Sequence, residues 1–89
     1  MRQVQITIVN RLGLHARPAA KLVTLASKFE SEVTLVHKNH AVNAKSIMAI
    51  MMLAACQGAE LALVAKGRDE DLAVEKIVEL FQGRFGEME

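Results

Sequence analysis

The 89-residue sequence predicts an α+β protein in which helices pack on one face of a single, largely antiparallel sheet. Two observations predict this class. The spacing of apolar residues changes several times between a period of two, typical of strands, and a period of about 3.6, typical of helices. The resulting order is βαββαβα, and strands this few, with helices between them, favour an antiparallel sheet with one covered face. The length suits one domain over residues 1–89.

The first strand and the first helix are predicted from a change of period near residue 16. Val4, Ile6 and Ile8 alternate with polar residues, as in a half-buried strand. Residues 10–13 are expected to form a loop. After that loop, apolar residues recur at the spacing of one helix face. The members of this face are Ala19, Leu22, Val23, Ala26 and Phe29.

A hairpin and a second helix follow. The segment EVTLVH at 32–37 is rich in β-branched residues and predicts a strand. KNH at 38–40 predicts a tight turn, and AVNA at 41–44 a short third strand. Ser46 is a suitable N-cap for the apolar run that follows. Gln57-Gly58 is expected to end this helix, because glycine suits the left-handed position after a helix.

The last two elements are a strand and a helix. ELALVAKG at 60–67 predicts the fourth strand, which ends at its glycine. Asp69 is expected to cap the last helix, with Glu70 and Asp71 favourably placed near its positive end. Gly83 is expected to end it. The predicted buried stripe consists of Val74, Ile77, Val78 and Phe81.

Composition excludes several classes. The net charge of +1 divides into +5 over residues 1–49 and −4 over residues 50–89, which would attract an acidic partner if the basic residues share one surface. Solvated faces that segregate by chain half explain the division equally well. Exposed aromatic platforms for nucleic acid are missing, since only three phenylalanines represent the aromatic residues, so no nucleic-acid partner is expected.

The sequence also predicts a cytoplasmic protein that does not insert into membranes. The longest apolar run, residues 47–56, is shorter than the roughly 20 residues of a membrane span. Residues 1–13 alternate polar and apolar side chains, unlike a signal peptide. A lone cysteine, Cys56, excludes an internal disulfide and fits a reducing compartment. It is expected to be a small buried hydrophobic residue.

GLHARPAA at 13–20 places a titratable ring and a fixed cation where the first helix begins. Pro18 is tolerated in a first turn, because its missing N–H has no partner there, so His15 falls at or just before the N-cap. Unpaired N–H groups and the helix dipole stabilise an anion such as phosphate and disfavour imidazolium. The ring is therefore expected to be neutral and nucleophilic at cell pH. Arg17 adds a planar cation that pairs well with phosphate oxygens.

Spacing alone leaves an alternative open, in which His15 merely caps the helix beside an exposed Arg17. No acidic residue lies within six positions of His15, so a local acid–base relay is not evident. His37 and His40 are three positions apart and could suggest metal ligation. No third ligand is near them, and a turn between strands explains the polar residues. No metal and no cofactor are expected.

Two motifs resemble those of the HPr family, the histidine-containing phosphocarriers of the bacterial phosphotransferase system, including its nitrogen-branch members (NPr). They are GLHARPAA at 13–20 and KSIMAIMMLA at 45–54, which is similar to the regulatory-serine segment. The resemblance covers essentially the whole chain. It implies an open-faced β-sandwich, with four antiparallel strands covered on one side by three helices. Two departures are the hairpin KNHAVNA, which lacks the glycine often seen there, and the extended C-terminus RFGEME.

The resemblance also implies a function. His15 would accept a phosphoryl group from phosphorylated Enzyme I, forming a pros-phosphohistidine, and pass it to an Enzyme II A component. Arg17 would stabilise the phosphoryl group and its transition state. Such a protein is a phosphoryl-transfer intermediate rather than a free-standing enzyme, and a monomer is expected. The sequence leaves open whether it serves sugar uptake or nitrogen-related regulation.

The second motif predicts a partner surface. Ile47, Met48 and Met51 are expected to be exposed, because one short helix is hard to bury on every face and flexible methionines suit several partners. The core-facing residues are expected to be Ile50, Leu53 and Ala54. The resemblance adds Leu14 and Ala20, near His15, to the surface that contacts Enzyme I and Enzyme II components. The alternative is that the methionines fill an aromatic-poor core.

Ser46 has two possible roles. As an N-cap its hydroxyl contributes about 1 kcal/mol to the helix. The resemblance adds that it is a regulatory phosphorylation site of an HPr kinase/phosphorylase. Its phosphate would add about −1.5 to −2 charges beside an apolar surface and weaken docking. A rival function is a regulatory interaction module that binds partners through Ile47, Met48 and Met51, with His15 incidental.

Overall fold

A computed structural model describes residues 1–87 and confirms the predicted order βαββαβα. A short 3₁₀ turn, η1, follows the last helix. The elements are β1 (Arg2–Thr7), α1 (Ala16–Ala26), β2 (Glu32–His37), β3 (His40–Asn43), α2 (Ile47–Met52), β4 (Glu60–Lys66), α3 (Glu70–Gln82) and η1 (Arg84–Gly86).

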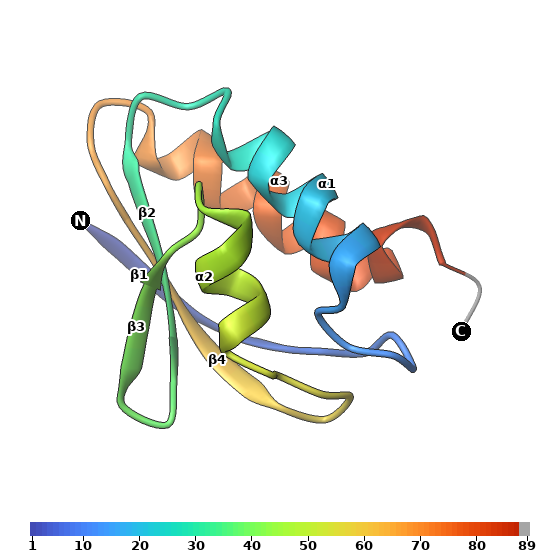
Figure 1. The fold of residues 1–89 in the computed structure, drawn as a ribbon. Coiled ribbons are helices and arrows are strands. Elements are labelled where there is room, and N and C mark those ends of the chain that lie inside the picture. The colour runs from blue at the N-terminus through green and yellow to red at the C-terminus, as the bar shows by residue number, and fades with distance from the viewer. Residues whose placement is uncertain (88–89) are drawn as a thin grey trace.

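The four strands form one antiparallel sheet in the order β1-β4-β2-β3, so the last strand in the sequence lies between the first two. The three helices cover one face of this sheet and leave the other face open (Figure 1). This arrangement is the predicted open-faced sandwich. Among residues 1–87, no helix has the length and apolar character to cross a membrane.

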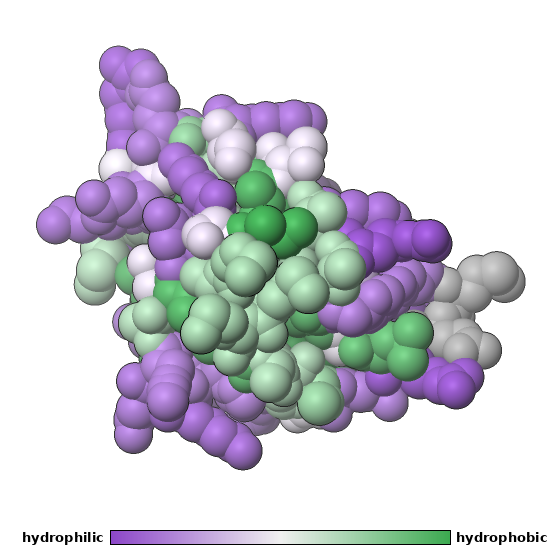
Figure 2. Space-filling view, in the orientation of Figure 1, coloured by the Kyte–Doolittle hydropathy of each residue, from purple (hydrophilic) through white to green (hydrophobic). Residues whose placement is uncertain are grey.

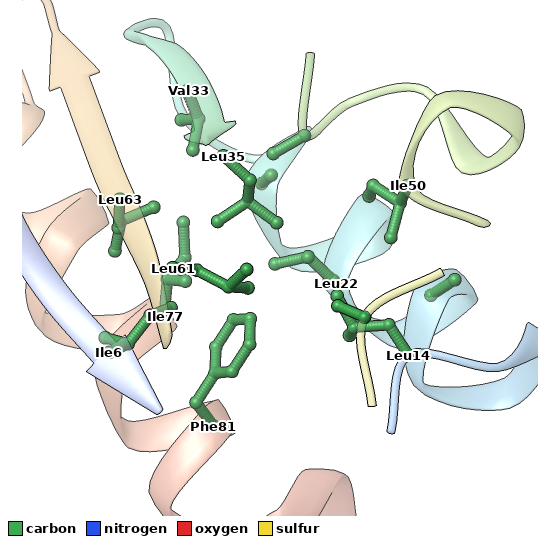
Figure 3. Close-up of a cluster of buried hydrophobic side chains, with 14 of the residues drawn as sticks. Ile6, Leu14, Leu22, Val33, Leu35, Ile50, Leu61, Leu63, Ile77 and Phe81 are labelled. Atoms are coloured by element: carbon green, nitrogen blue, oxygen red, sulfur yellow. The ribbon is translucent and has the colours of Figure 1, made fainter. Parts of the chain in front are cut away.

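The core lies between the sheet and the helices (Figure 3). Fully burying one such aliphatic or aromatic side chain contributes roughly 1.5–3 kcal/mol. The predicted stripe of α3 is confirmed except at Val78, which is only partly buried, while Ala73 is fully buried. Fully buried side chains from all the layers include Leu22, Leu35, Ile50, Leu61, Leu63, Ile77 and Phe81.

The β2–β3 hairpin closes without glycine. Lys38 and Asn39 take φ values of 49° and 69°, the pattern of a two-residue type I′ turn whose twist matches the strands. Asparagine tolerates this region, whereas lysine there costs about 1–2 kcal/mol. The strand after the turn begins at His40, one residue earlier than predicted, and pairs it with His37.

The second helix is shorter than predicted. Ser46 is its N-cap, and its hydroxyl oxygen accepts a hydrogen bond from the N–H of Ala49 at 3.3 Å, as expected. The helix ends at Met52, however, and not at Gln57-Gly58, because Ala54 turns into the left-handed region with φ 52°. As a result Ala54 is exposed, contrary to the prediction that it faces the core. Gly58 instead bends the chain toward β4, with φ 88°.

Asp69 occupies the predicted N-cap position of α3, but its side chain makes no cap hydrogen bond. Its carboxylate accepts hydrogen bonds from the N–H groups of Glu30 at 2.9 Å and Ser31 at 3.0 Å, and from the Ser31 hydroxyl. The pKa of Asp69 is lowered, mainly by the Ser31 hydroxyl and then by the Glu30 amide. This carboxylate therefore ties the start of α3 to the chain between α1 and β2.

Candidate active site

His15 is the N-cap of α1, as predicted, and its side chain makes no cap hydrogen bond. The loop before it is fixed against the segment that follows α2. Gly13 has φ 68°, and a Cβ there would lie 2.4 Å from the carbonyl oxygen of Ala55, so only glycine fits. The N–H of Leu14 donates to the same oxygen at 3.0 Å. The backbone thus places His15 independently of its own side-chain contacts.

The imidazole of His15 contacts a carboxylate from the far end of the chain. Its Nε2 lies 2.9 Å from Oε2 of Glu87, 72 positions later in the sequence. Figure 1 shows the segment after α3 (red) lying beside the start of α1 (blue). The other oxygen of Glu87 accepts a hydrogen bond from Nδ2 of Asn10 at 2.9 Å. The fully buried Asn10 also donates to the carbonyl of Gly13 at 2.8 Å, so one amide joins the loop to Glu87.

Glu87 is ionised at neutral pH. Its pKa is lowered, first by the Asn10 hydrogen bond, then by the hydrogen bond of His15, and by the Arg17 cation. A carboxylate only accepts hydrogen bonds, so Nε2 of His15 carries the hydrogen that lies between them. In a neutral imidazole the unshared electron pair is then on Nδ1. The ring is 36% exposed, which leaves it accessible to a reactant.

The start of α1 offers positive groups to an anion. Ala16 and Arg17 are the first helical residues, and their N–H groups lack an acceptor within the helix, while Pro18 has no N–H. Arg17 is exposed, and its guanidinium makes no hydrogen bond or ion pair with another residue of the described range 1–87. No acidic residue lies in the first turn. An anion from outside the chain can therefore bind here.

Together these groups suit nucleophilic catalysis by His15. A neutral Nδ1 can form a covalent bond, while helix amides and Arg17 stabilise the charge of an attached oxyanion group. The other predicted histidines do not join this site. His37 and His40 pair across the hairpin turn, and within residues 1–87 no group of three or more His, Cys, Asp or Glu side chains could hold a metal ion.

The surface of α2 is apolar, as predicted (Figure 2). Met48 is 67% exposed, and Ile47 and Met51 are also exposed, whereas Ile50 and Leu53 are buried. Met52, 78% exposed, belongs to the same surface and was not predicted, because the helix was expected to continue past it.

Two side-chain predictions near this surface are wrong. Leu14 is buried in the core, because its backbone hydrogen bond to Ala55 turns the side chain inward, so it cannot be part of an exposed partner surface. Ala20 is exposed, as that surface requires. Cys56 is also exposed, not buried, because α2 ends early and the chain around it runs along the surface.

The sheet, the three helices and the histidine that starts the first helix define a class, the small phosphocarrier domains built on an open-faced sandwich. A family model described as "PTS HPr component phosphorylation site" matches residues 2–83. The chain belongs to this HPr family. It is a phosphocarrier protein of the phosphotransferase system, whose partners include Enzyme I and Enzyme II components.

Individual relatives support this family assignment. The chain is 49% identical over 87 residues to phosphocarrier protein HPr of Xylella fastidiosa, covering 98% of each chain, and 42% identical to phosphocarrier protein NPr of Shewanella violacea, covering 93% and 91%. A crystal structure of HPr from Thermoanaerobacter tengcongensis covers 100% of both chains with a TM-score of 0.96 and 48% identity. A structure described as an HPr dimer from that organism covers 98% and 100%, with a TM-score of 0.79 and 49% identity.

His15 and Arg17 lie at the start of α1, as predicted, whereas Asn10 and Glu87 were not predicted to lie near them. No local pattern could reveal the contact, since 72 positions separate His15 from Glu87. The only signal was the C-terminal extension RFGEME, which carries Glu87.

Proposed function

We propose that His15 is the phosphoryl carrier of this protein and that phosphorus bonds to its Nδ1. The observation that supports this most is the contact of Nε2 with Glu87, because it leaves the unshared pair on Nδ1 at the start of α1. Phosphorylated Enzyme I is the donor, and a histidine or cysteine of an Enzyme II A component is the acceptor.

The phosphoryl transfer needs no general base. The pair on Nδ1 forms the N–P bond, the bond between phosphorus and the donor atom breaks, and its electron pair stays on the donor. No proton has to leave Nδ1, because the ring proton is on Nε2. Arg17 is exposed in the first turn and can pair with the oxygens of the phosphoryl group, where charge develops. The open site lets the same group leave again.

The partner surface of this proposal consists of α2 and the adjoining face of α1. Its exposed residues are Ala20, Ile47, Met48, Met51 and Met52. An apolar surface of this kind, rich in flexible side chains, fits several partners in turn. The protein acts as a single-domain monomer over residues 1–89, in the cytoplasm where those partners work. Both the sugar and the nitrogen branch are compatible with these features.

Ser46 is proposed as a regulatory phosphorylation site for an HPr kinase/phosphorylase. Its hydroxyl is partly buried at the start of α2 and next to the exposed methionines. A phosphate there would place about −1.5 to −2 charges at the edge of the apolar surface. Docking of Enzyme I, rather than the fold, would be weakened.

Phosphoenolpyruvate and Enzyme I provide the test. The wild-type protein is expected to gain one acid-labile phosphate, and His15→Ala to gain none while its unfolding midpoint is unchanged. A label that survives in His15→Ala would contradict the proposal. A protein that never becomes labelled but still binds Enzyme I would favour the rival regulatory module acting through Ile47, Met48 and Met51.

A further inference from the structure

The C-terminal segment that carries Glu87 is held in place by contacts of its own. Phe85 is buried and packs edge-on against Phe81, with ring centroids 4.8 Å apart. The carbonyl of Phe85 accepts a hydrogen bond from Nζ of Lys21 in α1. Phe85 and Gly86 take φ values of 55° and 80°, which turn the chain back toward the start of α1. The position of Glu87 is therefore built by the fold and does not depend on His15.

Both oxygens of Glu87 have defined partners. Asn10 donates to Oε1 and His15 lies against Oε2, each at 2.9 Å. Asn10 is fully buried and is fixed by its second bond to Gly13, so the carboxylate cannot rotate freely. Glu87 itself is only 17% exposed. A carboxylate fixed in this way can orient an imidazole and select which nitrogen carries the proton.

The contact also blocks one end of the ring. An incoming phosphoryl group is anionic and would be repelled by the carboxylate at Nε2. At Nδ1 the unshared pair is available, and the carboxylate bonds to the opposite nitrogen. Tautomer and charge thus favour the same nitrogen for two separate physical reasons.

We infer that Glu87 is a positioning residue for phosphoryl transfer: its carboxylate holds Nε2 of His15 and so directs the phosphoryl group to Nδ1. This inference rests on the proposed function, because it assigns a residue to that same reaction. Glu87 does not bond to phosphorus. It acts through the orientation and the tautomer of the His15 ring.

Two substitutions separate this role from a simple loss of packing. In Glu87→Gln, the amide of Asn10 still needs an oxygen, so the NH₂ group of the new glutamine faces His15. That group donates, which requires Nε2 to accept and moves the ring proton to Nδ1. Glu87→Ala removes the contact and leaves both tautomers populated. Glutamine is the more conservative replacement in shape, yet it is expected to be the more harmful one.

The experiment combines ring ¹⁵N chemical shifts with phosphorylation rates at pH 8, above the ordinary titration range of imidazole. Wild type is expected to show the Nε2–H tautomer, Glu87→Ala a mixture and Glu87→Gln mainly Nδ1–H. Rates from phosphoenolpyruvate with limiting Enzyme I are expected to fall in the same order, by about tenfold for Glu87→Gln, the lower end of the loss that follows replacement of a residue orienting a metal-bound histidine. Glu75→Gln, which removes an exposed carboxylate on α3, is the matched control and is expected to match wild type.

Each outcome decides a different question. Unchanged ring shifts in Glu87→Gln would overturn the inference, and so would a rate loss without a tautomer change or a greater loss in Glu87→Ala than in Glu87→Gln. A wild-type protein that gains no phosphate on His15 would overturn the proposed function instead. The ring shifts of the unphosphorylated protein would still show whether Glu87 selects the tautomer.

Discussion

The two long helices begin in opposite ways. The start of α3 is supplied with negative charge by the chain itself: Glu70 accepts from the N–H of Gly67 at 3.1 Å and pairs with the N-terminal amino group at 2.9 Å. The pKa of Glu70 is lowered, mainly by that amino group. At the start of α1 the first turn contains no acid and instead carries Arg17.

The start of α3 therefore stabilises the fold, whereas the start of α1 can bind an anion. At α3, Glu70 and Asp71 place negative charge in the first turn and offset the dipole, and the bonds of Asp69 and Glu70 to Glu30 and Gly67 tie this end to neighbouring segments. At α1 the first turn has no such acid, so its dipole and its first N–H groups can act on an anionic ligand, as a carrier of an anionic group requires. Glu87, the carboxylate that comes near α1, bonds to the ring of His15 rather than to the free amides.

The largest expected effect comes from giving α1 the kind of start that α3 has. Arg17→Glu replaces the cation by an acid in the first turn, which repels the phosphoryl group. Phosphorylation by Enzyme I is expected to slow on the order of 100-fold, similar to the loss of one transition-state hydrogen-bond donor. The free energy of unfolding should change by less than about 1 kcal/mol, because an acid there favours the dipole but repels Glu87, whose pKa the Arg17 cation lowers. Initial rates and urea unfolding measure the two effects, and a variant that is phosphorylated as fast as wild type would contradict the comparison.

The next effect concerns the surface around each helix. Met48→Glu places a charge on the exposed face of α2. The KM of Enzyme I for the protein is expected to rise about tenfold, as for a residue in the centre of an interface. Stability should change little. Leu72→Glu on α3 is the control, because Leu72 is 48% exposed but lies outside the proposed partner surface. Steady-state kinetics distinguish them. Equal losses in both variants would argue against docking through α2.

A smaller effect is expected at the N-cap of α2. Ser46→Ala removes the acceptor for the N–H of Ala49 and should lower the free energy of unfolding by about 1 kcal/mol. The phosphorylation rate of His15 should stay within twofold, since the hydroxyl does not contact that site. Chemical denaturation and the rate assay on the same sample provide the check. A rate loss as large as that of Arg17→Glu would contradict the separation of the two helix ends.

The smallest effect is expected in the change of the free energy of unfolding with pH under acidic conditions. The pKa of Asp69 is lowered in the folded protein, so its ionised form stabilises the fold above its ordinary titration range, near pH 4, and this contribution is lost as the pH falls further. Asp69→Asn removes that titration, so its stability should vary less between pH 5 and pH 2 and should be lower than that of wild type at pH 7. Urea unfolding as a function of pH measures the slope. Identical slopes would show that the Ser31 contact does not matter energetically.

Local patterns were enough for the fold class and for the position of His15 and Arg17 at a helix start. The change of period at residue 16, together with Pro18, located the start of α1 and hence His15, and Ser46 marked the start of α2. The features that sequence reasoning missed depend on tertiary contacts. The left-handed turn at Ala54 ends α2 early, and Glu87 lies against His15 next to the buried Phe85. The turn at Ala54 has no sequence signal of its own, and for Glu87 the C-terminal extension RFGEME is the only one.

The burial errors have the same origin. The resemblance to the HPr family places Leu14, next to His15, in the partner surface, but its backbone bond to Ala55 turns it into the core. Cys56 was assigned to the interior on the basis of residue type, and the early end of α2 leaves it exposed. Neighbours in sequence and residue type are weak guides where two loops pack on each other.

The central claim is that Nδ1 of His15, at the uncompensated start of α1, is the atom that carries phosphorus. The most direct measurement is ¹⁵N–³¹P coupling in the ¹⁵N-labelled protein after incubation with phosphoenolpyruvate and Enzyme I. We expect a single coupled phosphorus on Nδ1, with Nε2 still protonated and facing Glu87. Phosphorus bonded to Nε2, or to any residue other than His15, would contradict the account.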